Sequence, residues 1–419
     1  MPPSLAHEII WLVAALAILG IITRPWGLPE AVWAVAGAAV LVLGSLVPWS
    51  QARAAMLEGT DVYLFLAGMM LLAELARTEG LFDWVAALAV RWARGTPSRL
   101  FALVYLVGIV VTALLSNDAT AVVLTPAVYA AAKKAHTDPL PYLFICAFIA
   151  NAASFLLPIS NPANLVVFAS HMPPLPVWLA HFILPSLVAI AATFFVLRGT
   201  QRRAFSGAFA ASVPLPTLTR GARLAALGIG LTAVALLWVS AAGQKLGMPT
   251  FAAGALTTIV VLLLERRAPW HLVKGVSWGV IPLVAGLFVL VAGLGRSGVL
   301  TQLEGALQHL ARGPGYAAGL AAGGSTAVAC NALNNLPVAL IAGSVGTSAA
   351  VSTHLKDALL IGVDLGPNLS VTGSLATILW LIALRREKVH VDGLTFLKLG
   401  TLVMPPALVL ALLASYFSV

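Results

Sequence analysis

Two short polar interruptions, Leu115-Ser116-Asn117-Asp118-Ala119 and Leu333-Asn334-Asn335-Leu336-Pro337, each divide a long apolar stretch in its middle. A second interruption follows each of them: Pro158-Ile159-Ser160-Asn161-Pro162-Ala163-Asn164 in the first case, and Val371-Thr372-Gly373-Ser374-Leu375-Ala376-Thr377 in the second. Unpaired backbone groups are costly in hydrocarbon, so broken helices at membrane depth are tolerated only where they line a cavity. We therefore interpret the four interruptions as one substrate site between two halves of a transporter.

The composition places the chain in a membrane. Of its 419 residues, 60% are hydrophobic and only 9% are charged, which predicts a polytopic helical membrane protein without a separate soluble domain. The net charge of +9 is better explained by Lys and Arg in cytoplasmic loops than by a nucleic-acid partner. We find no Walker motif, no nucleophile–base pair and no metal-ligand cluster, so we expect neither enzymatic activity nor a cofactor.

Apolar runs predict five spans in each half of the chain, together with one hairpin and one amphipathic segment. The hairpins cover 98–134 and 314–350, and the amphipathic segments 80–95 and 297–311 suit helices at the membrane interface. The predicted spans are 8–23, 29–47, 61–78, 140–170 and 176–198, then 222–242, 250–265, 276–294, 358–384 and 397–419. The runs 140–170 and 358–384 are expected to be broken helices.

The two halves match in spacing as well as in order. Asn117 and Asn335 lie 218 residues apart, and Asn161 and Ser374 lie 213 apart. We predict an N-terminal repeat over 1–198, a basic cytoplasmic linker over 199–221, and a C-terminal repeat over 222–419. Five spans per repeat force opposite orientations, and with both termini outside, 19 of the 24 Lys and Arg residues fall on the cytoplasmic side. Re-entrant and fully crossing hairpins fit this count equally well.

Asp118 and Asp364 are the two acidic residues placed deepest along their spans. Ionisable groups inside a membrane default to a functional interpretation, so both are candidate proton carriers. The alternative is that each carboxylate only accepts hydrogen bonds from the amides exposed at a helix break. Glu74, three residues before Arg77, is better interpreted as half of an ion pair near the cytoplasmic end.

Neutral polar residues gather at the same four interruptions. Amides and hydroxyls both donate and accept hydrogen bonds, and they suit a small polar solute carrying several oxygen atoms. The candidate substrate-binding residues are Asn117, Ser160, Asn161, Asn164, Asn334, Asn335, Thr372, Gly373, Ser374 and Thr377. Capping of the broken helices is the alternative role for each. The interruptions hold no Arg or Lys, which argues against a dianionic solute, and the two separated cysteines, Cys146 and Cys330, cannot form a three-sulfur site.

The chain resembles the ArsB-type arsenite and antimonite efflux permeases of the ion transporter superfamily. The resemblance extends over nearly the whole chain and is carried by four stretches: Phe65–Arg77, Leu115–Ala127, Asn334–Pro337, and Asp364–Asn368 followed by Thr372–Ala376. It implies export of trivalent arsenic and antimony hydroxides across a bacterial inner membrane. The export would be driven by protons or assisted by a separate arsenite-stimulated ATPase.

The chain departs from the sodium-coupled dicarboxylate carriers of that superfamily. Those proteins carry Ser-Asn-Thr in both halves, whereas this chain has Ser116-Asn117-Asp118 and Asn334-Asn335-Leu336. The difference favours protons over a pair of sodium ions. We therefore expect exchange of a proton for a neutral trihydroxide. The two alternatives are a sodium-coupled anion carrier of the same fold and the channel subunit of an ATPase-driven pump.

Overall fold

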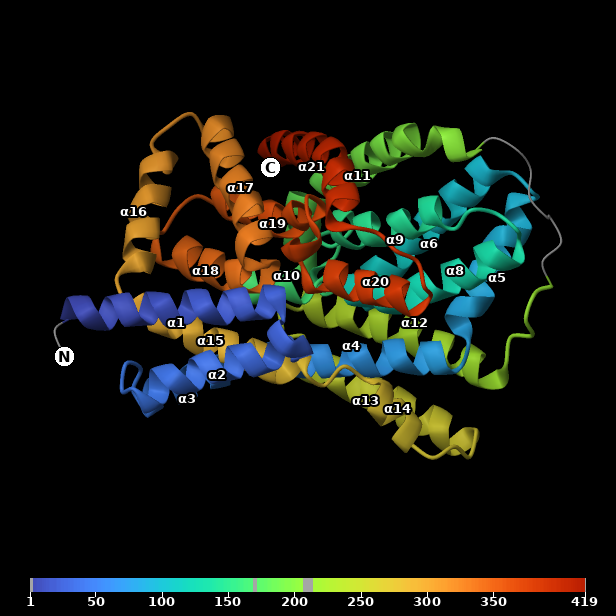
Figure 1. Ribbon diagram of the computed structural model, residues 1–419, viewed down its shortest axis with the longest axis horizontal. Coiled ribbons are helices and arrows are strands. Elements are labelled where there is room, and N and C mark those ends of the chain that lie inside the picture. Colours follow the sequence, from blue (N-terminus) through green and yellow to red (C-terminus); the bar gives the residue numbers. More distant parts are fainter. Residues whose placement is uncertain (1–2, 169–171, 206–213, 419) are drawn as a thin grey trace.

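The computed structural model describes residues 3–168, 172–205 and 214–418, and every regular element in these ranges is helical (Figure 1). Six helices are long and apolar enough to cross a membrane, and two bent pairs raise that number to eight. The bent pairs are α3–α4, at 45°, and α15–α16, at 78°. The prediction of an all-helical multi-pass protein is confirmed. The middle of the predicted linker, 206–213, the end of the predicted broken helix, within 169–171, and residues 1–2 and 419 lie outside the described ranges.

The first half runs from α1 to α11. Its helices are α1 (Pro3–Thr23), α2 (Glu30–Leu43), α3 (Trp49–Glu58), α4 (Thr60–Thr78), α5 (Leu81–Ala93), α6 (Pro97–Leu115), α7 (Asn117–Ala119), α8 (Thr125–Lys134), α9 (Leu140–Ala152), α10 (Pro162–Val167) and α11 (Leu175–Gln201). A π-helical turn, η2 (Thr120–Leu124), joins α7 to α8, and a 3-10 turn, η3 (Pro158–Ser160), precedes α10. The expected hairpin is therefore α6 with α7–α8, and the expected broken helix is α9 with α10.

The second half repeats this order. Its helices are α12 (Arg220–Ala241), α13 (Gly247–Leu264), α14 (Trp270–Gly275), α15 (Val280–Arg296), α16 (Val299–Ala311), α17 (Gly315–Leu333), α18 (Asn335–Ser348), α19 (Thr353–Leu365), α20 (Leu375–Arg386) and α21 (Gly393–Tyr416). Two 3-10 turns, η5 (Gly366–Asn368) and η6 (Val371–Gly373), lie between α19 and α20. The starts of α5, α6 and α11 precede those of α16, α17 and α21 by 218 residues, and the start of α10 precedes that of α20 by 213.

The halves interlock through exchanged pairs of helices. In the repeat, α4 corresponds to α15 and α2 corresponds to α13. α4 packs along α13, and in the same way α15 packs along α2. In Figure 1 the pair α4 and α13 lies along one side of the molecule, with α11 against α21 on the opposite side. Glycine permits the close crossing of α4 and α13, because a Cβ atom added at Gly68 would lie 2.3 Å from the carbonyl oxygen of Thr250.

The two amphipathic helices pack differently. α5 lies against α6 and α8, and small residues such as Ala86, Ala89 and Ala93 bury its apolar face on the first hairpin. α16, its counterpart, buries Leu307 and leaves an apolar cavity between itself and the second hairpin. An interfacial helix was expected at both places. In the first half, however, the apolar face is covered by protein.

Candidate functional site

Both hairpins turn at a polar residue with a left-handed backbone. Ser116 has φ 121° and ψ 163°, and Asn334 has φ 73° and ψ 153°. Such angles are uncommon outside glycine. Each side chain caps the helix that follows: Ser116 Oγ accepts from the Ala119 amide and Asn334 Oδ1 accepts from the Leu336 amide, both at 3.4 Å. The shared conformation explains why the chain breaks at these two places.

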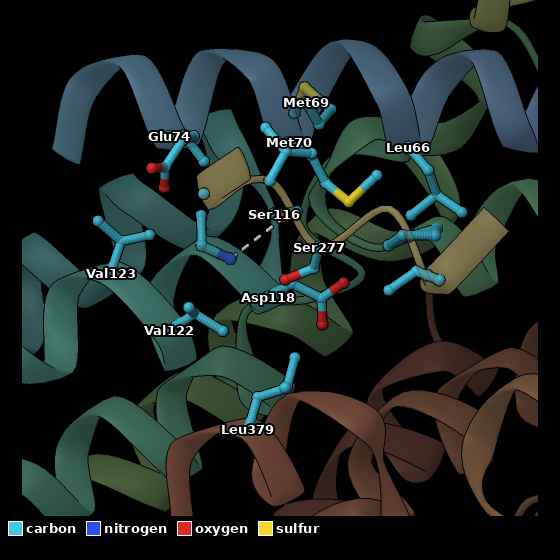
Figure 2. Close-up of a pocket in the computed structure, with 16 residues that line it drawn as sticks. Leu66, Met69, Met70, Glu74, Ser116, Asp118, Val122, Val123, Ser277 and Leu379 are labelled. Carbon is cyan, nitrogen blue, oxygen red and sulfur yellow. Dashed lines mark hydrogen bonds between the residues drawn. The ribbon is translucent and has the colours of Figure 1, made fainter. Parts of the chain in front are cut away.

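The first hairpin tip faces a pocket that both halves line (Figure 2). Ser116 and Asp118 come from the tip, Glu74 from α4, Ser277 from the turn before α15, and Leu379 from α20. Figure 2 shows the Asp118 carboxylate next to Ser277, with Met69 and Met70 above them on α4. The residues that line this pocket include two carboxylates and no Arg or Lys.

Glu74 is paired at the edge of this pocket. Arg77 donates from Nε to Glu74 Oε2 at 2.8 Å and from Nη2 to Oε1 at 2.5 Å, so the expected ion pair is confirmed. The Glu74 side chain is 8% exposed and the Arg77 side chain is half exposed. Because its charge is already balanced, Glu74 leaves Asp118 as the unpaired carboxylate of the pocket.

A second cavity is the counterpart of this pocket in the repeat. It is lined by Val166 on α10, Phe288 and Ala292 on α15, and Leu340 on α18. At the repeat offsets these positions correspond to Leu379, Met70, Glu74 and Val122, which line the first pocket. α10 contributes to both cavities, through Pro162 in the first and Val166 in the second. The broken helix therefore separates two related cavities.

Asp364 is sealed away from both cavities. Its side chain has no exposed surface, and Asn161 Nδ2 donates to its Oδ1 at 2.5 Å. Asn161 Oδ1 accepts from the amide of Ala163 and so caps α10. We expected Asp118 and Asp364 to share one lining, but Asp118 lines the first pocket and Asp364 does not. Instead, Asp364 contacts Asn161, which belongs to the second interruption of the N-terminal half.

Ser374 and Thr377 join a buried amide cluster at the start of α20. Ser374 Oγ lies 3.4 Å from Asn151 Oδ1 and accepts from the Thr377 amide at 3.1 Å. Asn151 Nδ2 donates to Asn368 Oδ1 at 3.0 Å and to Thr377 Oγ1 at 3.4 Å. Sequence reasoning left Asn151 out of the site, although its 213-residue offset from Asp364 marked it as the counterpart of that residue.

The other candidate residues mostly bind backbone in this conformation. Asn117 Oδ1 accepts from the Asp118 amide at 2.9 Å, and Ser160 Oγ donates to Ala113 O at 3.2 Å. Thr372 Oγ1 donates to Asn331 O at 2.9 Å, and Asn334 Nδ2 donates to Thr372 O at 3.4 Å. A Cβ at Gly373 would lie 2.5 Å from Pro367 Cα, and Asn335 is buried at the start of α18. These contacts hold the second hairpin tip against the turn before α20.

Other functional groups lie outside the predicted site. His181 on α11 and the buried Asp357 on α19 lie 2.6 Å apart, although 176 residues separate them in the chain. Cys146 and Cys330 are both buried and unpaired. The described residues contain no group of three or more His, Cys, Asp or Glu side chains placed to hold a metal ion.

Comparison with known proteins identifies the family. The chain is 29% identical over 368 residues to the arsenical pump membrane protein of Yersinia enterocolitica, covering 83% of each chain. It is 27% identical over 434 residues to that of Escherichia coli strain K12, covering 96% of each. The YdaH transporter crystal structure from Alcanivorax borkumensis has a similar fold, with a TM-score of 0.57 and 15% identity over 100% of this chain and 98% of that one. The citrate transporter (CitMHS) family profile matches residues 15–363, and the chain therefore belongs to this family of membrane transporters.

Proposed function

We propose that this protein exports arsenite and antimonite, as neutral trihydroxides, from bacteria in exchange for protons. The observation that carries the proposal is the first pocket, where the unpaired Asp118 carboxylate meets the hydroxyls of Ser116 and Ser277 and no Lys or Arg lines the walls. The relatives named arsenical pump membrane proteins cover most of the chain and support the same substrate class.

The negative charge of the pocket favours a neutral trihydroxide over citrate as the substrate. Citrate carries several negative charges and would meet the Asp118 carboxylate with no Lys or Arg in the lining to offset the repulsion. A neutral trihydroxide can instead donate to Asp118 and exchange hydrogen bonds with Ser116 and Ser277. The proposed site extends from this pocket to the second interruptions and includes the predicted residues at all four breaks.

Coupling would arise because proton and substrate bind alternately. In our proposal Asp118 takes a proton when the trihydroxide leaves, and Asp364 carries a proton at the contact between the halves. The repeats over 1–198 and 222–419 would then be inverted, with the linker 199–221 in the cytoplasm and both termini outside. The two related cavities on either side of α10 are suited to be the inner and outer access routes of such a cycle.

The deciding experiment is metalloid flux in proteoliposomes under separately imposed proton and sodium gradients. We expect arsenite flux that follows the proton gradient, needs no second protein, and is lost in Asp118→Asn. The matched control is Asp392→Asn, which neutralises an exposed carboxylate that caps α21. Flux that follows sodium, citrate in place of arsenite as the transported solute, or a strict requirement for a partner ATPase would each overturn the proposal.

A further inference from the structure

The contacts that the two halves make near Asp364 are related by the internal repeat. Asn161 and Ser374 are counterparts, and so are Asp364 and Asn151, at the same offset of 213 residues. Asn161 bonds Asp364 at 2.5 Å, and Ser374 bonds Asn151 at 3.4 Å. The two contacts are therefore equivalent: exchanging the two halves of the chain turns one contact into the other. The carboxyl group occupies one of two equivalent places, and a neutral amide occupies the other.

A third pair of counterparts extends the relation. Asn151 Nδ2 donates to Thr377 Oγ1 at 3.4 Å, and the counterparts of these residues are Asp364 and Asn164. At this second place the corresponding atoms are Asp364 Oδ2 and Asn164 Oδ1. Both are buried oxygens without a hydrogen-bond partner among the described residues. The repeat thus places two acceptors where the other half has a donor and an acceptor.

The orientation of the Asn164 amide is fixed by its surroundings. Its Nδ2 donates to the carbonyl of Ser154 at 2.8 Å and approaches those of Leu157 at 3.3 Å and Pro158 at 3.4 Å. A flipped amide would set its oxygen against these three carbonyl oxygens, so Oδ1 must be the atom left over. Two buried acceptors without a donor between them are unfavourable unless a proton joins them.

We infer that Asp364 carries its transported proton on Oδ2 and donates it to Asn164 Oδ1. Asn164 is then a positioning residue for the proton, and its role as a substrate ligand is replaced. This inference rests on the proposed exchange with protons and names the atoms that hold the proton. In this proposal the bound proton joins the two oxygens by a hydrogen bond across the contact between α10 and α19, and its release leaves two buried acceptors there without a donor.

One neighbouring group competes with Asn164 for this proton. The Ser154 hydroxyl, in the turn after α9, lies beside Asp364 and gives its own proton to Asn151 O at 2.8 Å, so its oxygen remains available as an acceptor. From α17 the Cys330 thiol faces Asp364 and lies 3.7 Å from Val363 O. α18 contains no charged residue, and Lys398 of α21 is exposed. On α19 itself Asp357 lies seven residues earlier and is paired with His181.

Two isosteric variants isolate the Asn164 oxygen. Asn164→Thr and Asn164→Val lose the same Nδ2 contacts and have nearly the same shape, but only threonine keeps an oxygen, as Thr377 does in the other half. The measurement is an infrared pH titration of the full-length protein in lipid nanodiscs without metalloid. The Asp364 carboxyl band is identified by its loss in Asp364→Asn. We expect the Val variant to bind the proton about tenfold more weakly than the Thr variant, which moves its midpoint about one pH unit lower.

The infrared titration of the Asp364 carboxyl does not depend on metalloid transport. If wild-type protein moves no metalloid but its Asp364 band titrates as described, the proposed function fails and the proton site remains. Equal midpoints in the two Asn164 variants would overturn the inference, as would a midpoint that depends on sodium. If neither variant folds, the Asp364 band in Ser154→Ala, which removes the competing hydroxyl, decides. A carbonyl frequency typical of a carboxyl that donates a hydrogen bond supports the site, and a free-carboxyl frequency refutes it.

Discussion

Asn161 joins the two halves and caps a helix with the same side chain, and these two roles can be separated. Asn161→Ala removes the cap on α10, which costs about 1 kcal/mol, together with the bond to Asp364. That bond contributes about 1 kcal/mol if the carboxyl is neutral and about 2 kcal/mol if it is ionised. We therefore expect Asn161→Ala to lower the free energy of unfolding by about 2–3 kcal/mol.

Asn161→Ser should keep the cap and weaken the second part. Serine occupies the counterpart position, where Ser374 caps α20 and lies 3.4 Å from Asn151 Oδ1, so at position 161 we expect a longer and weaker contact with Asp364. The expected loss is about 1 kcal/mol. Unfolding by SDS titration in mixed micelles gives both values. If Asn161→Ser unfolds like wild type, lengthening the contact with Asp364 does not affect stability. If it unfolds like Asn161→Ala, the cap and the contact are not separable as argued.

Three further predictions concern other parts of the molecule. Asp118→Asn should reduce proton-driven flux at least tenfold and leave the unfolding midpoint unchanged, because Asp118 lines a pocket and has no ion-pair partner; a large fall in thermal stability would contradict this. Gly68→Ala should destabilise by about 1–3 kcal/mol because its Cβ would meet the backbone of Thr250, whereas Gly230→Ala, in open space, should be neutral or stabilising in the same SDS titration. Burial raises the pKa of Glu79, opposed by Arg267, so the folded protein holds this proton more tightly than the unfolded chain. Stability should therefore fall as the pH rises above the usual value of 4.5, and Glu79→Gln should flatten that slope in thermal unfolding.

The positions of the spans and of the helix breaks could be predicted from the sequence, because unpaired backbone polar groups have a high free energy in hydrocarbon. A serine or asparagine in the middle of an apolar run has few explanations other than a helix break, and Ser116 and Asn334 both have the backbone of one. The repeat followed from spacing alone, since equal offsets of the breaks require equal elements between them. The hairpins, the broken helices and the Glu74–Arg77 pair were all accessible in this way.

The sequence could not say which breaks face each other. Asp118 and Asp364 look alike in a hydropathy profile, yet one lines a pocket and the other is sealed beneath α10. That difference depends on how α10 crosses α19, which no local pattern records. The pairing of His181 with Asp357 was inaccessible for the same reason. A histidine near the end of a span looks interfacial until its partner from a distant helix is known.

The burial of both cysteines has a practical consequence. Cys146 and Cys330 have no exposed surface, so a water-borne maleimide should leave the native chain unlabelled. A single cysteine introduced at Ser277 or Ser344 would report on one cavity at a time, against a silent background and without first removing a native thiol. Labelling rates on the two membrane faces would then show directly which route is open while a gradient is applied.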